Sequence, residues 1–165
     1  MISKINKLQN DNFFMDLKNK KILVTGGNGF LGKNVVRNLE NLGISDIITQ
    51  SSSDCDLRNM GNCKKAVDGI DVVFHLAAQS SVLVGYKNPR DTVETNVIGT
   101  VNMLEAIRSC NTLKSAVIVT TDKVYLNLEK KIKFKETAAL GGHDIYSSSK
   151  AACEILTESY IKSFY

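Results

Sequence analysis

The chain has 165 residues, of which 43% are hydrophobic, and it carries a formal net charge of +4. This length suffices for one domain with a sizeable core, and no apolar run is long enough to span a bilayer. The small positive excess lies in the first twenty residues and in 130–135. Such a pattern is typical of solvated surface charge rather than of a nucleic-acid interface.

Residues 1–19 are expected to form an N-terminal arm ahead of a single domain at 20–165. The arm contains lysines but lacks the apolar segment of a secretory signal, so we expect a short amphipathic helix or a frayed segment. No CxxC pair and no histidine at metal-ligand spacing accompany the four cysteines, which are Cys55, Cys63, Cys110 and Cys153. Reduced thiols, a cytoplasmic location and no metal site are therefore expected.

The first strand and helix are joined by a glycine turn at 21–32, which reads KILVTGGNGFLG. The apolar run at 22–24 suits a strand buried on both faces, and helical spacing begins at Phe30. Gly26, Gly29 and Gly32 follow the TGxxGxxG spacing. Because a helix N-terminus offers unpaired N–H groups and a partial positive charge, this turn favours the pyrophosphate of a dinucleotide. A glycine-rich turn without a ligand is the alternative.

The remaining elements alternate along the chain. Strands are predicted at 46–50, 71–76 and 115–120, helices at 60–67, 89–110 and 146–160, and loops at 51–56 and 127–142. Strands alternating with helices predict a doubly wound parallel sheet with its ligand at the carboxyl ends of the strands. One stripe of the helix at 89–110 is expected to be buried: Val93, Val97, Val101, Leu104 and Ile107. The inner face of the last helix is expected to carry Ala151, Ile155 and Leu156.

A second candidate site lies in the stretch YSSSK, where Tyr146 and Lys150 stand four residues apart. Residues at this spacing share a helix face, so the lysine can favour the ionised form of the phenol electrostatically. A tyrosinate at neutral pH is a usable general base. An ordinary surface pair is the alternative. Thr121 lies at the end of a predicted strand, where its hydroxyl could orient a substrate oxygen.

The motifs TGxxGxxG, LAA at 76–78, TTDKVY at 120–125 and YSSSK occur in this order. With them the chain resembles the extended short-chain dehydrogenase/reductase family from about residue 20 to 160. The resemblance implies a Rossmann fold, Tyr146 as the catalytic base, Lys150 lowering its pKa and holding the nicotinamide ribose, and Thr121 positioning a sugar hydroxyl. It also implies NAD as cofactor, with NADP not excluded. Cofactor contacts are implied for Gly26, Gly29, Phe30, Leu31, Gly32, Ser51, Asp56, Leu57, Leu76, Ala77, Ala78, Asn96, Tyr146 and Lys150.

Within this family, TDKVY at 121–125 and GGHDIY at 141–146 look most like the nucleotide-sugar 4,6-dehydratases, the CDP-glucose type in particular. The resemblance implies that Asp122 assists loss of the C6 hydroxyl. Lys123 stands where many dehydratases carry glutamate, and it could remove the C5 proton only if burial or a neighbouring cation lowered its pKa. A surface ion pair between these two residues is the alternative. A 4-epimerase or 4-keto reductase with the same base, and a non-catalytic NAD(P)-binding remnant, are the rival functions.

Two departures from the family pattern affect these expectations. Gln50, Ser51 and Ser52 occupy the place where an acidic residue usually holds the ribose 2′-hydroxyl, which leaves NAD and NADP open. Family members also continue with further strands and a substrate domain, so we expect an incomplete Rossmann domain with an exposed apolar sheet edge. Its expected partners are a nucleotide-activated hexose such as CDP-glucose, and either a second copy through the helices at 89–110 and 146–160 or a separately encoded C-terminal half.

Overall fold

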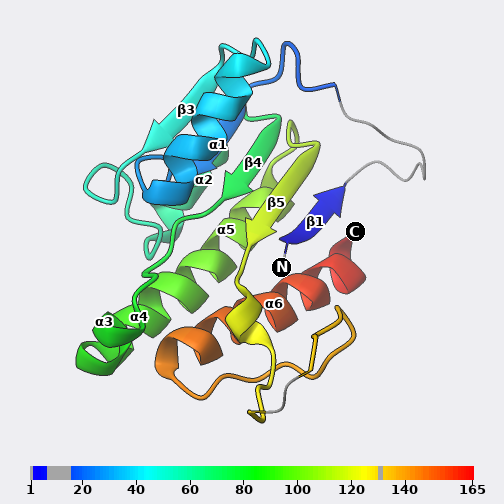
Figure 1. Cartoon of the computed structure of the whole chain (residues 1–165). Coiled ribbons are helices and arrows are strands. Elements are labelled where there is room, and N and C mark those ends of the chain that lie inside the picture. Colours follow the sequence, from blue (N-terminus) through cyan, green and yellow to red (C-terminus); the bar gives the residue numbers. More distant parts are fainter. Residues whose placement is uncertain (1, 7–15, 130–131) are drawn as a thin grey trace.

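The computed structural model describes residues 2–6, 16–129 and 132–165, which form one sheet flanked by helices (Figure 1). Four strands run parallel, in the spatial order β5, β4, β2, β3. These strands are β2 (Ile22–Thr25), β3 (Ile47–Gln50), β4 (Val72–His75) and β5 (Ser115–Val119). The predicted doubly wound parallel sheet is confirmed, and each predicted strand ends within one residue of the observed one.

The helices are α1 (Phe30–Asn41), α2 (Met60–Val67), α3 (Val82–Lys87), α4 (Pro89–Val93), α5 (Gly99–Ser109) and α6 (Ile145–Phe164). A π-helical turn, η1 (Glu94–Ile98), joins α4 to α5 without a break, and a short 3-10 turn, η2 (Asp122–Val124), follows β5. The helices predicted at 60–67, 89–110 and 146–160 are confirmed. The six-residue α3 was not predicted, because it is too short to show a helical period.

The core has two parts, one on each face of the sheet. On one face, α1 packs on Ile22, Val24 and Val72 through Leu39. On the other face, α2 and α5 cover Leu23 and Val73, and the last turns of α6 pack against the same cluster. The strands therefore alternate their side chains between two apolar layers, as the burial of β2 on both faces requires. None of the helices in the described part of the chain is long and apolar enough to span a membrane.

The first strand, β1 (Ile2–Asn6), lies antiparallel beside β5 at the edge of the sheet (Figure 1). The prediction of a helix in the N-terminal arm is therefore wrong for residues 2–6. The same prediction also covered residues 7–15, which lie outside the described part of the chain. The sequence predicted an exposed sheet edge without naming the strand; the structure pairs the edge of β5 along its whole length, from Ser115 to Val119. Its backbone hydrogen-bonding groups are thereby satisfied.

Two predicted core positions are also wrong, since Val93 is 40% exposed and Ile155 is 51% exposed. The buried face of the α4–α5 rod instead carries Thr92, Asn96 and Thr100. The π turn adds one residue to the helical repeat and so shifts the buried face by one position before α5. The rod and α6 meet here through polar contacts, such as the hydrogen bond of 2.8 Å from the Asn96 amide to the Ser149 hydroxyl.

We predict that replacing the N-cap residue of α6, Asp144, destabilises the domain. Asp144 accepts a hydrogen bond from the Ser147 backbone N–H at 3.0 Å and another from the Ser147 hydroxyl at 2.6 Å. Asp144→Ala should lower the free energy of unfolding by about 1 kcal/mol, whereas Asp144→Asn should change it by only a few tenths. Urea unfolding checks both, and an equal loss in the two variants would contradict the capping role.

Candidate functional site

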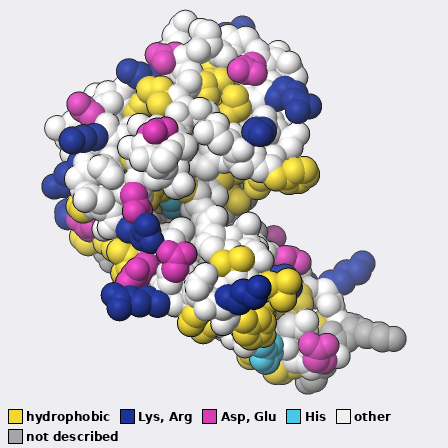
Figure 2. All heavy atoms as spheres, turned by 90° about the vertical axis from the view of Figure 1, so that its left-hand side faces the viewer, with side chains coloured by type: hydrophobic (Ala, Val, Ile, Leu, Met, Phe, Trp, Pro, Cys, Tyr) yellow, Lys and Arg dark blue, Asp and Glu magenta, His cyan; other side chains and the backbone are white. Residues whose placement is uncertain are grey.

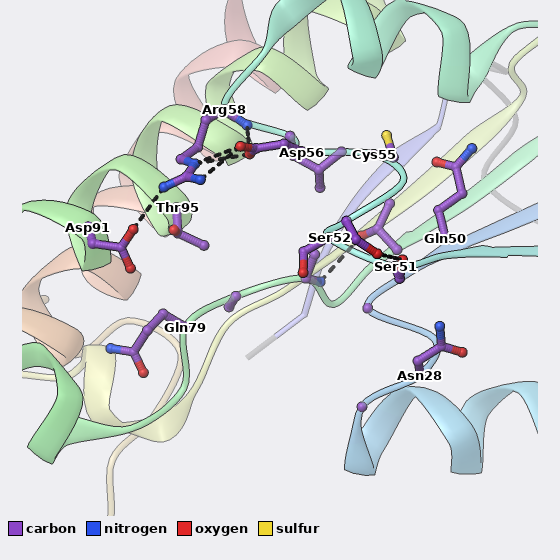
Figure 3. A pocket seen from close by; sticks show the side chains of 17 residues that line it. Asn28, Gln50, Ser51, Ser52, Cys55, Asp56, Arg58, Gln79, Asp91 and Thr95 are labelled. Atoms are coloured by element: carbon purple, nitrogen blue, oxygen red, sulfur yellow. Dashed lines mark hydrogen bonds and ion pairs between the residues drawn. The ribbon is translucent and has the colours of Figure 1, made fainter. Parts of the chain in front are cut away.

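The carboxyl ends of the four parallel strands meet at one edge of the sheet, because the last residue of β2 is in register with those of β3 and β4. A cavity of about 660 Å³ opens there (Figure 3). Figure 2 shows the molecule hollowed between an upper and a lower part. The cavity is lined by Thr25, Gly26, Asn28, Gly29, Gln50, Ser51, Ser52, Ser53, Cys55, Asp56, Leu57, Arg58, Ala77, Ala78, Gln79, Asp91 and Thr95.

Two glycines of the turn at one end of this cavity, Gly26 and Gly32, have no room for a side chain. Gly26 has a φ of +70°, and a Cβ built on it would lie 2.8 Å from the backbone nitrogen of Ala77. A Cβ on Gly32 would collide with the carbonyl oxygen of Gly26, so the first turn of α1 packs directly on the turn. The glycines thus bring the start of α1 against the ends of β2 and β4, which the TGxxGxxG spacing predicted.

The start of α1 suits an anion. Its N-cap is Gly29, which offers no capping side chain, and the first turn contains no acidic residue. The first N–H groups of a twelve-residue helix are therefore left for a ligand, together with the positive end of the helix dipole. The residues present fit a dinucleotide, whose pyrophosphate would approach the backbone where no Cβ intervenes.

The structure brings about half of the predicted cofactor residues to the cavity wall. Those on the wall are Gly26, Gly29, Ser51, Asp56, Leu57, Ala77 and Ala78. Those that do not line it are Phe30, Leu31, Gly32, Leu76, Asn96, Tyr146 and Lys150. Gly32 acts through packing, as described above, and Phe30 and Leu31 are exposed on the first turn of α1 next to Gly29. Direct contact of the second group with a cofactor stays a prediction.

Asn96 lies behind the wall and holds it in place. Its side-chain oxygen accepts a hydrogen bond from the Gln79 N–H at 2.8 Å, and its amide donates to the Gln79 carbonyl at 3.0 Å and to the Ser149 hydroxyl at 2.8 Å. Because this side chain is buried, each of these bonds is sheltered from water. Asn96 therefore ties the segment after β4, from the η1 turn, to α6.

Tyr146 and Lys150 lie on adjacent turns at the start of α6, as their spacing predicted. Lys150 is buried, and its Nζ donates a hydrogen bond of 2.8 Å to the carbonyl of Val119, the last residue of β5. Burial lowers the pKa of the Lys150 ammonium, while Cys153 and Glu154 oppose this shift. Tyr146 is half-buried beside α3, where a Cβ on Gly85 would be 3.4 Å from the Tyr146 nitrogen.

The other three predicted catalytic residues follow β5 directly. The Thr121 hydroxyl accepts a hydrogen bond from the Lys123 N–H at 3.4 Å, which caps η2, and donates to the Asp122 carboxylate at 3.1 Å. Asp122 and Lys123 are both exposed. Among the described residues the two form no ion pair with each other, so the alternative of a surface ion pair does not describe them.

Comparison with known proteins identifies the family. Residues 22–165 match the family described as NAD dependent epimerase/dehydratase family. The chain belongs to this family. CDP-glucose 4,6-dehydratase of Salmonella typhimurium is 39% identical over 95 residues, which cover 58% of this chain and 26% of that protein. dTDP-glucose 4,6-dehydratase of Mycolicibacterium smegmatis is 30% identical over 166 residues, which cover 87% of this chain and 50% of that protein.

A solved structure of the same family agrees with the fold. UDP-glucose 4-epimerase of Thermus thermophilus, in complex with NAD, matches with a TM-score of 0.74 and 27% sequence identity. The match covers 87% of this chain and 51% of that one. The chain therefore spans about half of that enzyme and between a quarter and a half of the two dehydratases. NAD is the family's cofactor, and the predicted Rossmann fold and family are confirmed.

Two buried polar residues near the site, His75 and Glu154, were not predicted from the sequence as site residues. The Thr25 hydroxyl accepts a hydrogen bond from the Ala77 N–H at 3.3 Å and lies 2.8 Å from His75 Nδ1. The other ring nitrogen, His75 Nε2, lies 3.2 Å from the Thr100 hydroxyl, so the imidazole is hydrogen-bonded on both sides. The carboxylate of Glu154 accepts from the Thr120 hydroxyl at 2.7 Å. The sequence did contain a signal for His75, because this polar residue stands at the end of the otherwise apolar strand β4.

We predict that His75 makes stability fall as the pH is lowered. Burial lowers the pKa of His75 from 6.5 to about 3, and the charge of Lys150 adds to this effect. As the pH falls below about 6.5, His75 becomes protonated in the unfolded chain but stays neutral in the folded one. The contribution of His75 to the free energy of unfolding is therefore fully present above that pH and decreases below it. Between about pH 6.5 and pH 5 the free energy of unfolding should fall by up to about 1.4 kcal/mol per pH unit.

Urea unfolding across this pH range, with two variants, tests the assignment. His75→Asn should flatten the slope, whereas His143→Asn, at an exposed position, should leave it as in the unmodified chain. Equal slopes in all three proteins would contradict the role of His75.

We predict that Gly32→Ala weakens NAD binding, because the added methyl group pushes α1 away from Gly26. Overpacking of this kind costs about 1–3 kcal/mol, which corresponds to roughly a tenfold or greater loss of affinity where the loop takes up the strain. The matched control is Gly99→Ala, since a Cβ there would be in ordinary contact, 3.7 Å from the Leu57 side chain. Calorimetric titration with NAD measures both, and unchanged affinity in Gly32→Ala would contradict the packing argument.

Proposed function

We propose that this chain is the cofactor-binding half of a nucleotide-sugar 4,6-dehydratase acting on a hexose such as CDP-glucose. The observation that carries the proposal is the hydrogen bond from Lys150 Nζ to the carbonyl of Val119. It anchors the start of α6 at the same sheet edge as the glycine turn and the cavity. The 39% identity with a CDP-glucose 4,6-dehydratase supports the choice of reaction and substrate.

In this proposal Tyr146 takes the proton from the C4 hydroxyl of the sugar. Lys150 has three N–H donors, and one of them is used by Val119, so the others can bind the hydroxyls of the nicotinamide ribose. Lys150 is also proposed to act on Tyr146, which lies one turn away on the same helix. When bound, NAD supplies the group that accepts hydrogen from C4 and later returns it to C6.

The residues of η2 would carry the elimination of water. Thr121 is fixed by its two hydrogen bonds at the end of β5, where its hydroxyl would orient the sugar. Asp122 is exposed next to it and would give a proton to the departing C6 hydroxyl. Lys123 would remove the C5 proton, which requires that a bound substrate bury this exposed side chain and favour its neutral form.

The chain spans about half of two of the relatives it matches, so the proposal includes a partner that adds to the nucleotide-sugar surface. Val93 and Ile155 expose apolar side chains on the two helices expected to form a helix bundle, which supports homodimerisation through α4–α5 and α6. A separately encoded C-terminal half is the other proposed partner. We assign the domain to the cytoplasm because all four cysteines are thiols rather than disulfides.

A 4-epimerase is the second candidate, and the 27% identity with a UDP-glucose 4-epimerase over 87% of this chain supports it. A 4-keto reductase would use the same base, and an NAD(P)-binding remnant would bind cofactor without turnover. Incubation with NAD and CDP-glucose separates the dehydratase, the epimerase and the remnant by product. A 4-keto-6-deoxy sugar supports the dehydratase, inversion at C4 supports the epimerase, and cofactor binding without a product supports the remnant.

We predict that Tyr146→Phe abolishes turnover of the nucleotide sugar, since it removes only the hydroxyl that accepts and returns the proton. NAD affinity should stay within about twofold, because the aromatic ring and Lys150 remain in place. The matched control is Tyr86→Phe, which removes a hydroxyl from an exposed position on α3. Turnover equal to that of the control would remove Tyr146 from the mechanism.

A further inference from the structure

Arg58 joins two parts of the cavity wall that lie far apart in the sequence (Figure 3). Its Nε donates to both carboxylate oxygens of Asp56 at 3.0 Å, and its Nη2 donates to one of them at 2.8 Å. Its Nη1 donates to the carboxylate of Asp91, on α4, at 2.8 Å. All three side chains line the cavity, so the guanidinium links the loop after β3 to the α4–α5 rod across this end.

The backbone beneath Arg58 is fixed as well. The side-chain amide of Asn102, on α5, donates hydrogen bonds of 2.9 Å to the carbonyls of Leu57 and Arg58. The Arg58 N–H donates to Asp56 at 3.0 Å, which closes a tight turn. The contact to Asp91 is therefore the part of this arrangement that can open without disturbing the loop.

Asp56 is tightly engaged while Arg58 is in place. Its two oxygens take hydrogen bonds from the Nε, Nη2 and backbone N–H of Arg58. These bonds lower the pKa of the Asp56 carboxyl, which remains ionised and bound to the guanidinium at neutral pH. An adenine entering this end meets a planar guanidinium held in a fixed orientation, and such a plane stacks on aromatic rings.

We propose that Arg58, held between Asp56 and Asp91, is a clasp that closes the adenosine end of the cavity and slows release of the dinucleotide. The clasp is defined by these three residues. This inference rests on the proposed function, because it assumes that a nicotinamide dinucleotide binds in the cavity. It adds a retention device at the end of the cavity that these three residues line.

The exposure of the clasp explains how a ligand would strengthen it. The side chains of Arg58, Asp56 and Asp91 are 44%, 43% and 49% exposed, so water screens their attraction in the absence of a ligand. A dinucleotide in the cavity displaces part of this water, which strengthens the ion pairs and makes their opening slower. Salt ions can reach side chains that are exposed to this extent and weaken their attraction further.

The test measures the rate at which NADH leaves the protein, by stopped-flow fluorescence with excess NAD as the displacing ligand. Asp91→Asn and Arg58→Gln should each speed release by about fivefold. The matched control is Arg90→Gln, because Arg90 forms an ion pair with Glu94 on the same rod and does not line the cavity. The control should release NADH at the rate of the unmodified chain, and thermal unfolding verifies that all variants fold.

The Asp91→Asn variant separates a clasp from general electrostatics, because the two predict opposite signs. Removing a negative charge from the wall should tighten binding of an anionic dinucleotide, unless that charge holds Arg58 in place. Slower or unchanged release in this variant overturns the clasp while leaving the proposed function intact. Binding of neither NADH nor NAD by the unmodified chain overturns both. Added salt should speed release less in Asp91→Asn than in the unmodified chain, and an equal effect also overturns the clasp.

Discussion

The close approach of α1 to the backbone of Gly26 is the constraint on which the rest of the site depends. No residue with a side chain fits at Gly32, because a Cβ there would collide with the Gly26 carbonyl. Gly26 also lies directly against the backbone of Ala77, which follows β4. The ends of β2 and β4 and the start of α1 are therefore held in fixed positions relative to one another. An anion-binding helix end is thereby aimed at the edge where the parallel strands finish. The cavity then extends sideways from this point toward Asp56 and Asp91.

Buried polar contacts hold the other walls to this frame. Asn96 binds the backbone of Gln79 and the hydroxyl of Ser149, and Lys150 binds the carbonyl of Val119. Glu154, one turn beyond Lys150, takes the hydroxyl of Thr120. Each contact joins two of three parts, which are a strand end, α6 and the rod that includes η1. A buried polar group that loses its hydrogen-bond partner destabilises the fold, because it no longer contacts water either. These contacts therefore favour a single arrangement of the elements, since a shift of any one element would break them.

Local features of the site could be predicted from the sequence, and contacts between distant segments could not. The spacing of Gly26, Gly29 and Gly32 and the four-residue step from Tyr146 to Lys150 are properties of short stretches. The exposure of Val93 depends on the π turn that follows it, which no apolar period reveals. The bond from Arg58 to Asp91 spans 33 residues and forms only when the sheet and the rod are assembled. The pairing of β1 with β5 likewise depends on an edge that the rest of the sheet creates.

The most direct measurement of the central claim is a crystal structure of this chain grown with NAD. The account predicts the pyrophosphate on the N–H groups at the start of α1, next to Gly29, with the nicotinamide ring beside the phenol of Tyr146. A pyrophosphate bound elsewhere on the protein, or a nicotinamide ring on the opposite side of the sheet from Tyr146, would contradict it.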